Sequence, residues 1–144
     1  AMRIDADIAI FKLCQERRAQ PFAWGVRDCL TFAADSLQAW TGRDIAADVR
    51  GRYHSAASAA ELLRHVGGIR ALAMRAGQHV PHLDDMQTGD LVLVRREFQQ
   101  LCAPAEEGMG AIAVFWRGHL VGQGAKGLGY LLPAAALAAW RPVL

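Results

Sequence analysis

Hydrophobic residues recur at helical spacing through the first two thirds of the chain and at strand spacing through the last third. The helical periodicity predicts four helices, over residues 5–19, 29–40, 56–66 and 69–76. Apolar and β-branched runs between turn signals predict four strands, over residues 90–95, 111–116, 119–123 and 129–132. Pro133 can start a last helix over residues 134–140, because proline suits the first turn of a helix.

The second predicted helix is the most apolar one. Its polar residues Thr31, Asp35 and Gln38 fall on one narrow face, so the rest of the helix is expected to be buried at the centre of the domain. On the first helix, Cys14 belongs to the apolar stripe of Ala6, Ile10 and Leu13, and it is interpreted as a core residue.

Helices followed by antiparallel strands indicate an α+β fold, with the helices on one side of the sheet. No internal repeat, low-complexity tract or linker interrupts the chain, so residues 1–144 are predicted to form a single domain. A chain of this length with 53% apolar residues has enough material for one core.

Charge and hydropathy exclude several classes of partner. The net charge of +2 is too small to indicate nucleic acid or an anionic membrane surface. No apolar run approaches the roughly 20 residues of a membrane span, and no signal-peptide pattern opens the sequence. We therefore expect a protein that is cytoplasmic when it is made.

The chain contains three widely spaced cysteines, Cys14, Cys29 and Cys102. An odd number without CxxC spacing argues against a disulfide framework or a zinc site, and it favours a reducing compartment.

Cys29 stands out because it begins the central helix directly after Asp28, a residue type that caps helices. The positive end of the helix dipole and the unpaired backbone N–H groups there stabilise a thiolate. Asp28 could also act chemically, but its negative charge would oppose thiolate formation, so we interpret it as the cap.

Two short motifs carry a family resemblance. Trp24-Gly25 precedes Asp28-Cys29 by four residues, and Gly89-Asp90-Leu91-Val92 opens the predicted sheet. With a buried helix behind the cysteine, this pattern resembles the NlpC-type papain-like cell-wall peptidases, most of all the short phage-encoded relatives associated with tail assembly. The resemblance covers about residues 20–125.

The resemblance implies a papain-like fold, in which the helix bearing the cysteine packs on a C-terminal antiparallel sheet. It places Cys29 as the nucleophile toward an amide of a peptidoglycan stem peptide, with its own backbone N–H as a candidate oxyanion donor. A histidine at the start of the second strand would take the proton, and Gln123 falls near the position that orients that histidine. No cofactor or metal is implied.

The sequence departs from the family at the base position. The second strand begins Met109-Gly110-Ala111-Ile112, without a titratable side chain. Phe22 also stands where an aromatic hydroxyl is common, and Leu30-Thr31 replaces the usual Ser-Gly. A thiol without a base within about 3 Å depends on the helix end alone for ionisation.

The histidines offer weak substitutes for that base. His119 follows a turn at the far end of the hairpin, roughly 20 Å away at about 3.3 Å per residue. His65 is expected on a helix surface, whereas His54 lies in a loop that could fold over Cys29. His79 and His82 with their neighbouring acids invite a metal interpretation, but a solvated loop is preferred.

Three further features have a structural and a functional interpretation. Trp24 and Phe22 are candidate substrate-binding residues, although packing on the helix start is the simpler role for Trp24. The segment Arg50-Gly51-Arg52-Tyr53 could bind an acidic partner, but we interpret it as an ion-paired surface loop.

Two functions follow from these features. The preferred hypothesis is a degenerate family member that lacks its base and serves as a structural component of a phage or prophage tail, with other tail proteins as partners. The alternative is an active endopeptidase or amidase that uses Cys29 on peptidoglycan stem peptides. The missing histidine favours the first, and the cysteine in its motif favours the second. A third, weaker possibility is a binding module that keeps the cleft and holds a stem peptide without cutting it.

Overall fold

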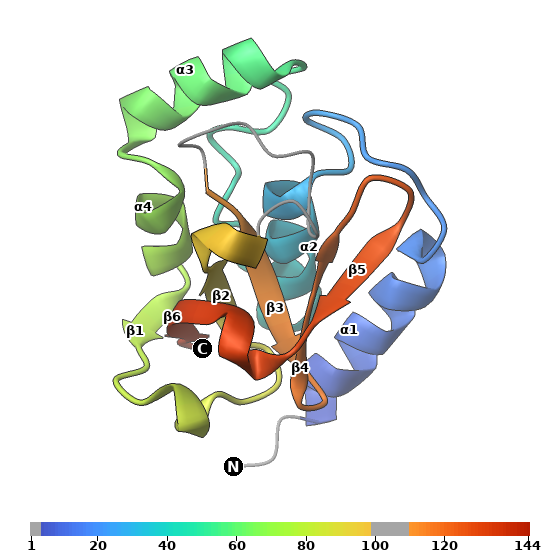
Figure 1. Cartoon of the computed structure of the whole chain (residues 1–144), viewed down its shortest axis with the longest axis vertical. Coiled ribbons are helices and arrows are strands. Elements are labelled where there is room, and N and C mark those ends of the chain that lie inside the picture. The colour runs from blue at the N-terminus through green and yellow to red at the C-terminus, as the bar shows by residue number, and fades with distance from the viewer. Residues whose placement is uncertain (1–3, 99–109) are drawn as a thin grey trace.

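The computed structural model describes residues 4–98 and 110–144, and these residues form four α-helices and a six-stranded antiparallel sheet (Figure 1). The helices are α1 (Ile4–Arg17), α2 (Cys29–Thr41), α3 (Ala56–Val66) and α4 (Ile69–Met74). The strands are β1 (Gly77–His79), β2 (Leu91–Val94), β3 (Ile112–Trp116), β4 (His119–Gln123), β5 (Leu128–Leu131) and β6 (Ala136–Pro142). The predicted α+β class is confirmed.

The strand order in the sheet is β1-β6-β2-β3-β4-β5, so the last strand lies between the first two. The prediction of a helix over residues 134–140 was wrong. Pro133–Ala135 form a 3₁₀ turn, and the chain then continues as β6. Alanine prefers helix by only a few tenths of a kcal/mol per residue, and pairing with two neighbouring strands outweighs that preference. Strand β1 was missed because three residues are too few to show alternation.

A bulge marks the pairing of β6 with β2. Leu93 pairs with Ala138 and Val94 pairs with Ala136, which leaves Leu137 as the extra residue. Leu137 is accordingly exposed, while its neighbours Ala136 and Ala138 are buried. Because of the bulge, Ala136 and Ala138 each still reach a core, one on either face of the sheet.

Helices cover one face of the sheet, and α2 packs across β3 and β4 (Figure 1). Alternate strand residues divide between two cores, as Ile112 and Val114 face the helices while Ala111 and Ala113 face the other side. The burial of α2 on nearly all sides confirms its predicted central place. Cys14 is buried in the helix-side core, as predicted.

Two further sequence predictions concern membrane spans and the connection that follows residue 96. Within residues 4–98 and 110–144, no helix has the length and hydropathy that a membrane span requires. The polar connection predicted over residues 97–108 lies outside the described residues from residue 99 onward, and so does Cys102.

Alkaline pH is expected to destabilise the fold through Cys14. Burial raises the pKa of this thiol from 9.0 to about 11, so the folded protein keeps a proton that the unfolded chain releases. This contribution is intact below about pH 9 and is lost as the pH rises toward 11. In urea unfolding at pH 8 and pH 11, we expect Cys14→Ala to lose about 2–3 kcal/mol less stability than the natural chain. Equal losses would contradict this assignment.

Candidate active site

The loop between α1 and α2 brings Cys29 to its place through short backbone contacts. The Phe22 N–H donates to the Ala125 carbonyl at 3.0 Å, which joins the loop to the β4–β5 turn. Ala23 and Arg27 form an isolated antiparallel bridge, with N–H···O distances of 2.9 and 2.8 Å. This bridge folds the Trp24-Gly25 motif into a tight turn directly before the helix.

Asp28 is the N-cap residue of α2, and it is buried. Its Oδ1 accepts from the Thr31 N–H at 2.8 Å, and the Thr31 hydroxyl accepts from the Asp28 N–H at 2.9 Å, which completes a capping box. Its Oδ2 accepts from the Gly25 N–H at 2.8 Å and from the Tyr53 hydroxyl at 2.6 Å. The carboxylate is therefore engaged on both oxygens, as a structural cap requires.

Gly25 is required here by its backbone conformation and by its neighbour. Its φ of +78° lies in the left-handed region that glycine tolerates best. A Cβ on Gly25 would also collide with the Tyr53 carbonyl oxygen. The Trp-Gly motif thus has a physical cause, because only glycine permits the loop around residue 53 to approach this turn.

Cys29 occupies the first position of α2, where its side chain is half-buried and packs against the helix-side core. Burial raises the pKa of Tyr53, and the charge of Asp28, its hydrogen-bond partner, raises it further. Tyr53 thus keeps its proton and donates it to the carboxylate that caps the helix of Cys29. Sequence reasoning missed Tyr53, which was assigned to a surface loop but is buried. Its only signal was an aromatic residue in an otherwise polar segment.

Gln123 ends β4 and is fully buried. It follows Val121 by two residues and therefore faces α2, because Val121 belongs to the helix-side core. Its Nε2 donates to the Gln20 carbonyl at 2.9 Å and to the Gly124 carbonyl at 3.0 Å. Within the described part of the chain, its Oε1 has no hydrogen-bond partner. Gln123 thus binds the loop that leads to Cys29.

The two aromatic candidates lie together on that loop. Phe22 and Trp24 are half-buried and pack edge to face, with ring centroids 4.8 Å apart and an interplanar angle of 87°. This geometry is favourable for an aromatic pair.

The start of β3 is apolar where the family resemblance calls for a base. Ala111 and Ile112 are buried, and a Cβ on Gly110 would meet the Ile69 side chain. Extension of the β3–β4 register places Ile112 opposite Gln123. Met109 lies outside the described residues. At residues 110–112, therefore, no side chain can accept a proton.

The five histidines lie on different parts of the fold. His119 begins β4 whereas Gln123 ends it, and its ring packs between Trp116 and Tyr130 at centroid distances of 5.7 and 5.2 Å. The remaining four occupy the segment before α3, the last turn of α3, strand β1 and the loop after it: His54, His65, His79 and His82. His54 follows Tyr53 directly and is exposed.

The metal interpretation of the loop after β1 finds no geometric support. No group of three or more His, Cys, Asp or Glu side chains in the described ranges is placed to hold a metal ion. His79 packs against Trp140, with ring centroids 5.8 Å apart.

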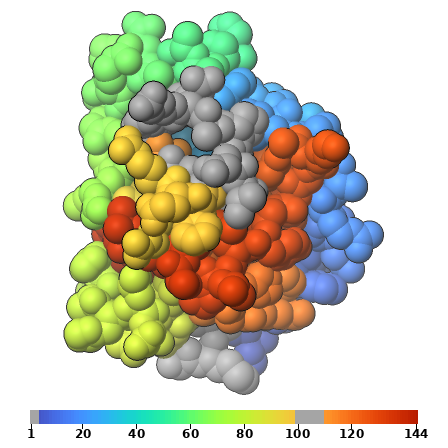
Figure 2. Space-filling view, in the orientation of Figure 1, coloured from blue at the N-terminus to red at the C-terminus, as the bar shows by residue number. Residues whose placement is uncertain are grey.

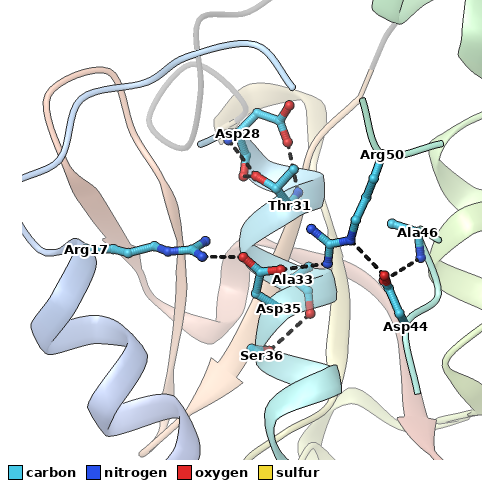
Figure 3. Close-up of polar contacts among 9 residues, drawn as sticks. All are labelled: Arg17, Asp28, Thr31, Ala33, Asp35, Ser36, Asp44, Ala46 and Arg50. Carbon is cyan, nitrogen blue, oxygen red and sulfur yellow. Dashed lines mark hydrogen bonds and ion pairs between the residues drawn. The ribbon is translucent and has the colours of Figure 1, made fainter. Parts of the chain in front are cut away.

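A second carboxylate on α2 organises the middle of the helix, as Figure 3 shows. Asp35 binds Arg17 from α1 on one side and Arg50 on the other, the latter at 2.6 Å. Arg50 also donates to Asp44 at 2.8 Å. The segment around Arg50 is therefore ion-paired, as interpreted from the sequence, although its arginine is partly buried rather than freely exposed. Sequence alone gave no sign of which acids it would meet.

Comparison with known protein families matches residues 2–142 to one described as Domain of unknown function (DUF6950). The chain belongs to this family. A search of curated proteins found no match. The DUF6950 match extends over all the residues of the candidate site, and it assigns no chemistry to them.

The Tyr53 hydroxyl is expected to stabilise this region. Tyr53→Phe removes its hydrogen bond to Asp28 and leaves a buried carboxylate with one donor fewer, so we expect a loss of about 2 kcal/mol in urea unfolding. Tyr130→Phe is the matched control, because that ring is half-exposed; its effect should stay within about 0.5 kcal/mol. Equal effects of the two substitutions would show that the Tyr53–Asp28 contact contributes nothing.

Proposed function

We propose that this protein is a non-catalytic relative of the NlpC-type papain-like cysteine peptidases and that it serves as a structural component of a phage-like tail. Three features support the proposed kinship. A cysteine begins a buried, capped helix, that helix packs across β3 and β4, and the antiparallel strands follow it in the sequence. The role in a tail rests on the resemblance of the sequence to tail-associated relatives.

The apolar start of β3 is the observation that supports the proposed loss of catalysis. In the proposed ancestry, the strand that faces the helix would supply the imidazole, but residues 110–112 offer no titratable side chain and two of them are buried. Gln123, the candidate orienting residue, instead donates both of its hydrogen bonds to backbone carbonyls. An orienting group without a base has no catalytic task.

The alternative of an active peptidase is favoured by Cys29 itself. Its place at the start of α2 puts the sulfur near the positive end of a helix dipole and beside its own backbone N–H. A thiolate there would attack a peptide carbonyl and form an acyl-enzyme. The amine would leave with a proton, and water would release the acyl group. The proton donor and acceptor for these steps would have to come from elsewhere, with exposed His54 as one candidate.

A structural role predicts that Cys29 is dispensable for assembly. In a phage or prophage that encodes this chain, deletion of the gene should abolish tail formation, and a Cys29→Ala copy should restore particle yield to within about twofold of the natural copy. Electron microscopy and plaque counts measure both. Well-folded Cys29→Ala protein that fails to restore tails would contradict the proposal.

Peptidoglycan digestion separates the two hypotheses directly. Purified protein is incubated with peptidoglycan, and mass spectrometry records whether new amine ends appear. A non-catalytic protein should release no more fragments than Cys29→Ala. Fragments that appear with the natural chain and with Cys14→Ala, but vanish with Cys29→Ala, would establish the peptidase instead. Cys14→Ala is a suitable control because Cys14 is buried in the core.

A further inference from the structure

Helix α1 has two apolar stripes, and only one of them is buried in this fold. Ala6, Ile10, Leu13 and Cys14 form the buried stripe. The outer stripe consists of Ile4, Ile8 and Phe11, whose exposed fractions are 54%, 47% and 39%. A spacing of four and then three residues is the pattern with which a helix packs against a second helix.

The surroundings of the outer stripe leave room for a partner. Helix α1 forms a flank of the molecule on the side away from α3 and α4 (Figures 1 and 2). A groove of about 510 Å³ runs beside the stripe, between α1 and the end of α2. Its lining includes Ile8, Ala9, Lys12 and Leu13 of α1 and Ala39 and Trp40 of α2.

Phe11 is held in position on the opposite side of the stripe. The Arg117 guanidinium lies over its ring at 5.2 Å, and the Trp116 ring lies 6.4 Å away. Arg117 is itself fixed by two hydrogen bonds to Asp7, at 2.8 and 3.0 Å. An aromatic side chain that is already ordered loses little entropy when a partner covers it.

We propose that the outer stripe binds a second copy of this chain, with the two α1 helices antiparallel. Charge complementarity identifies this occupant. Asp5 and Lys12 lie two turns apart beside the stripe, one acidic and one basic. An antiparallel copy centred near Ile8 brings Asp5 of each chain to Lys12 of the other, so the ion pair forms twice. A parallel copy would place these two flanks on opposite sides of the helix pair, so neither ion pair would form.

The contact is small, which sets the expected affinity. One helix pair with a groove beside it lies at or below the lower end of the roughly 1,200–2,000 Å² that stable interfaces bury. The dimer should therefore be weak, with a Kd on the order of micromolar to tens of micromolar. This association concerns a surface remote from Cys29 in the fold, and it does not depend on the proposed function.

Sedimentation equilibrium between about 1 and 300 μM protein tests the arrangement with variants in which the charges of Asp5 and Lys12 are reversed. The natural chain should shift from its monomer mass of 15.6 kDa toward twice that value. Asp5→Lys and Lys12→Asp should each weaken association about tenfold, because each places like charges opposite one another. The combined variant should recover most of the affinity. Within one chain the two residues are about 10 Å apart along the helix, so recovery requires a second copy.

Two further variants guard the interpretation. Ile8→Asp should abolish association, whereas Met74→Asp, at a similarly exposed apolar residue on α4, should leave it unchanged. Circular dichroism confirms that each variant is folded before it is measured. A natural chain that remains monomeric over the whole range would overturn the proposal. So would association that survives Ile8→Asp, or a combined variant that associates no better than the single ones.

Discussion

The buried carboxylate of Asp28 is the interaction on which the rest of the site depends. A charge removed from water is tolerated only when hydrogen bonds replace its hydration, and here three donors converge on it. They come from the turn before α2, from the first turn of α2, and from Tyr53, which lies after the helix in the sequence. One side chain therefore sets the position of Cys29 relative to two loops.

About two turns further along, Asp35 of α2 also holds two flanking segments. Asp35 accepts from arginines that approach it from α1 and from the segment after α2 (Figure 3). Two acidic residues, Asp28 at the N-cap of α2 and Asp35 within it, thus hold the flanking segments. The apolar sides of the helix fill the core between α1 and the sheet. A buried helix that binds its surroundings through a few strong polar contacts gives one unique packing, which apolar contacts alone specify less sharply.

Local signals in the sequence predicted much of this fold. The Asp-Cys helix start and the buried character of α2 follow from residues that are neighbours in the chain. Strands β2, β3, β4 and β5 were predicted for the same reason, because each is a short run of neighbouring residues with a strand pattern. Contacts between distant residues were out of reach, as with Tyr53 on Asp28 and Arg17 on Asp35. The C-terminal strand was mistaken for a helix because alanine's intrinsic preference is visible in sequence, whereas the two strands that flank it are not.

The place of β6 between β1 and β2 has a consequence for how the protein is made. Until residue 142 has been synthesised, the strands on either side of β6 have no neighbour at that edge. The meander and the helices can collapse early around local contacts, but β1 joins the sheet only through β6, which follows it much later in the sequence. Until β6 joins, the facing edges of β1 and β2 are unpaired, and an unpaired strand edge is where one chain can pair with another and misassemble.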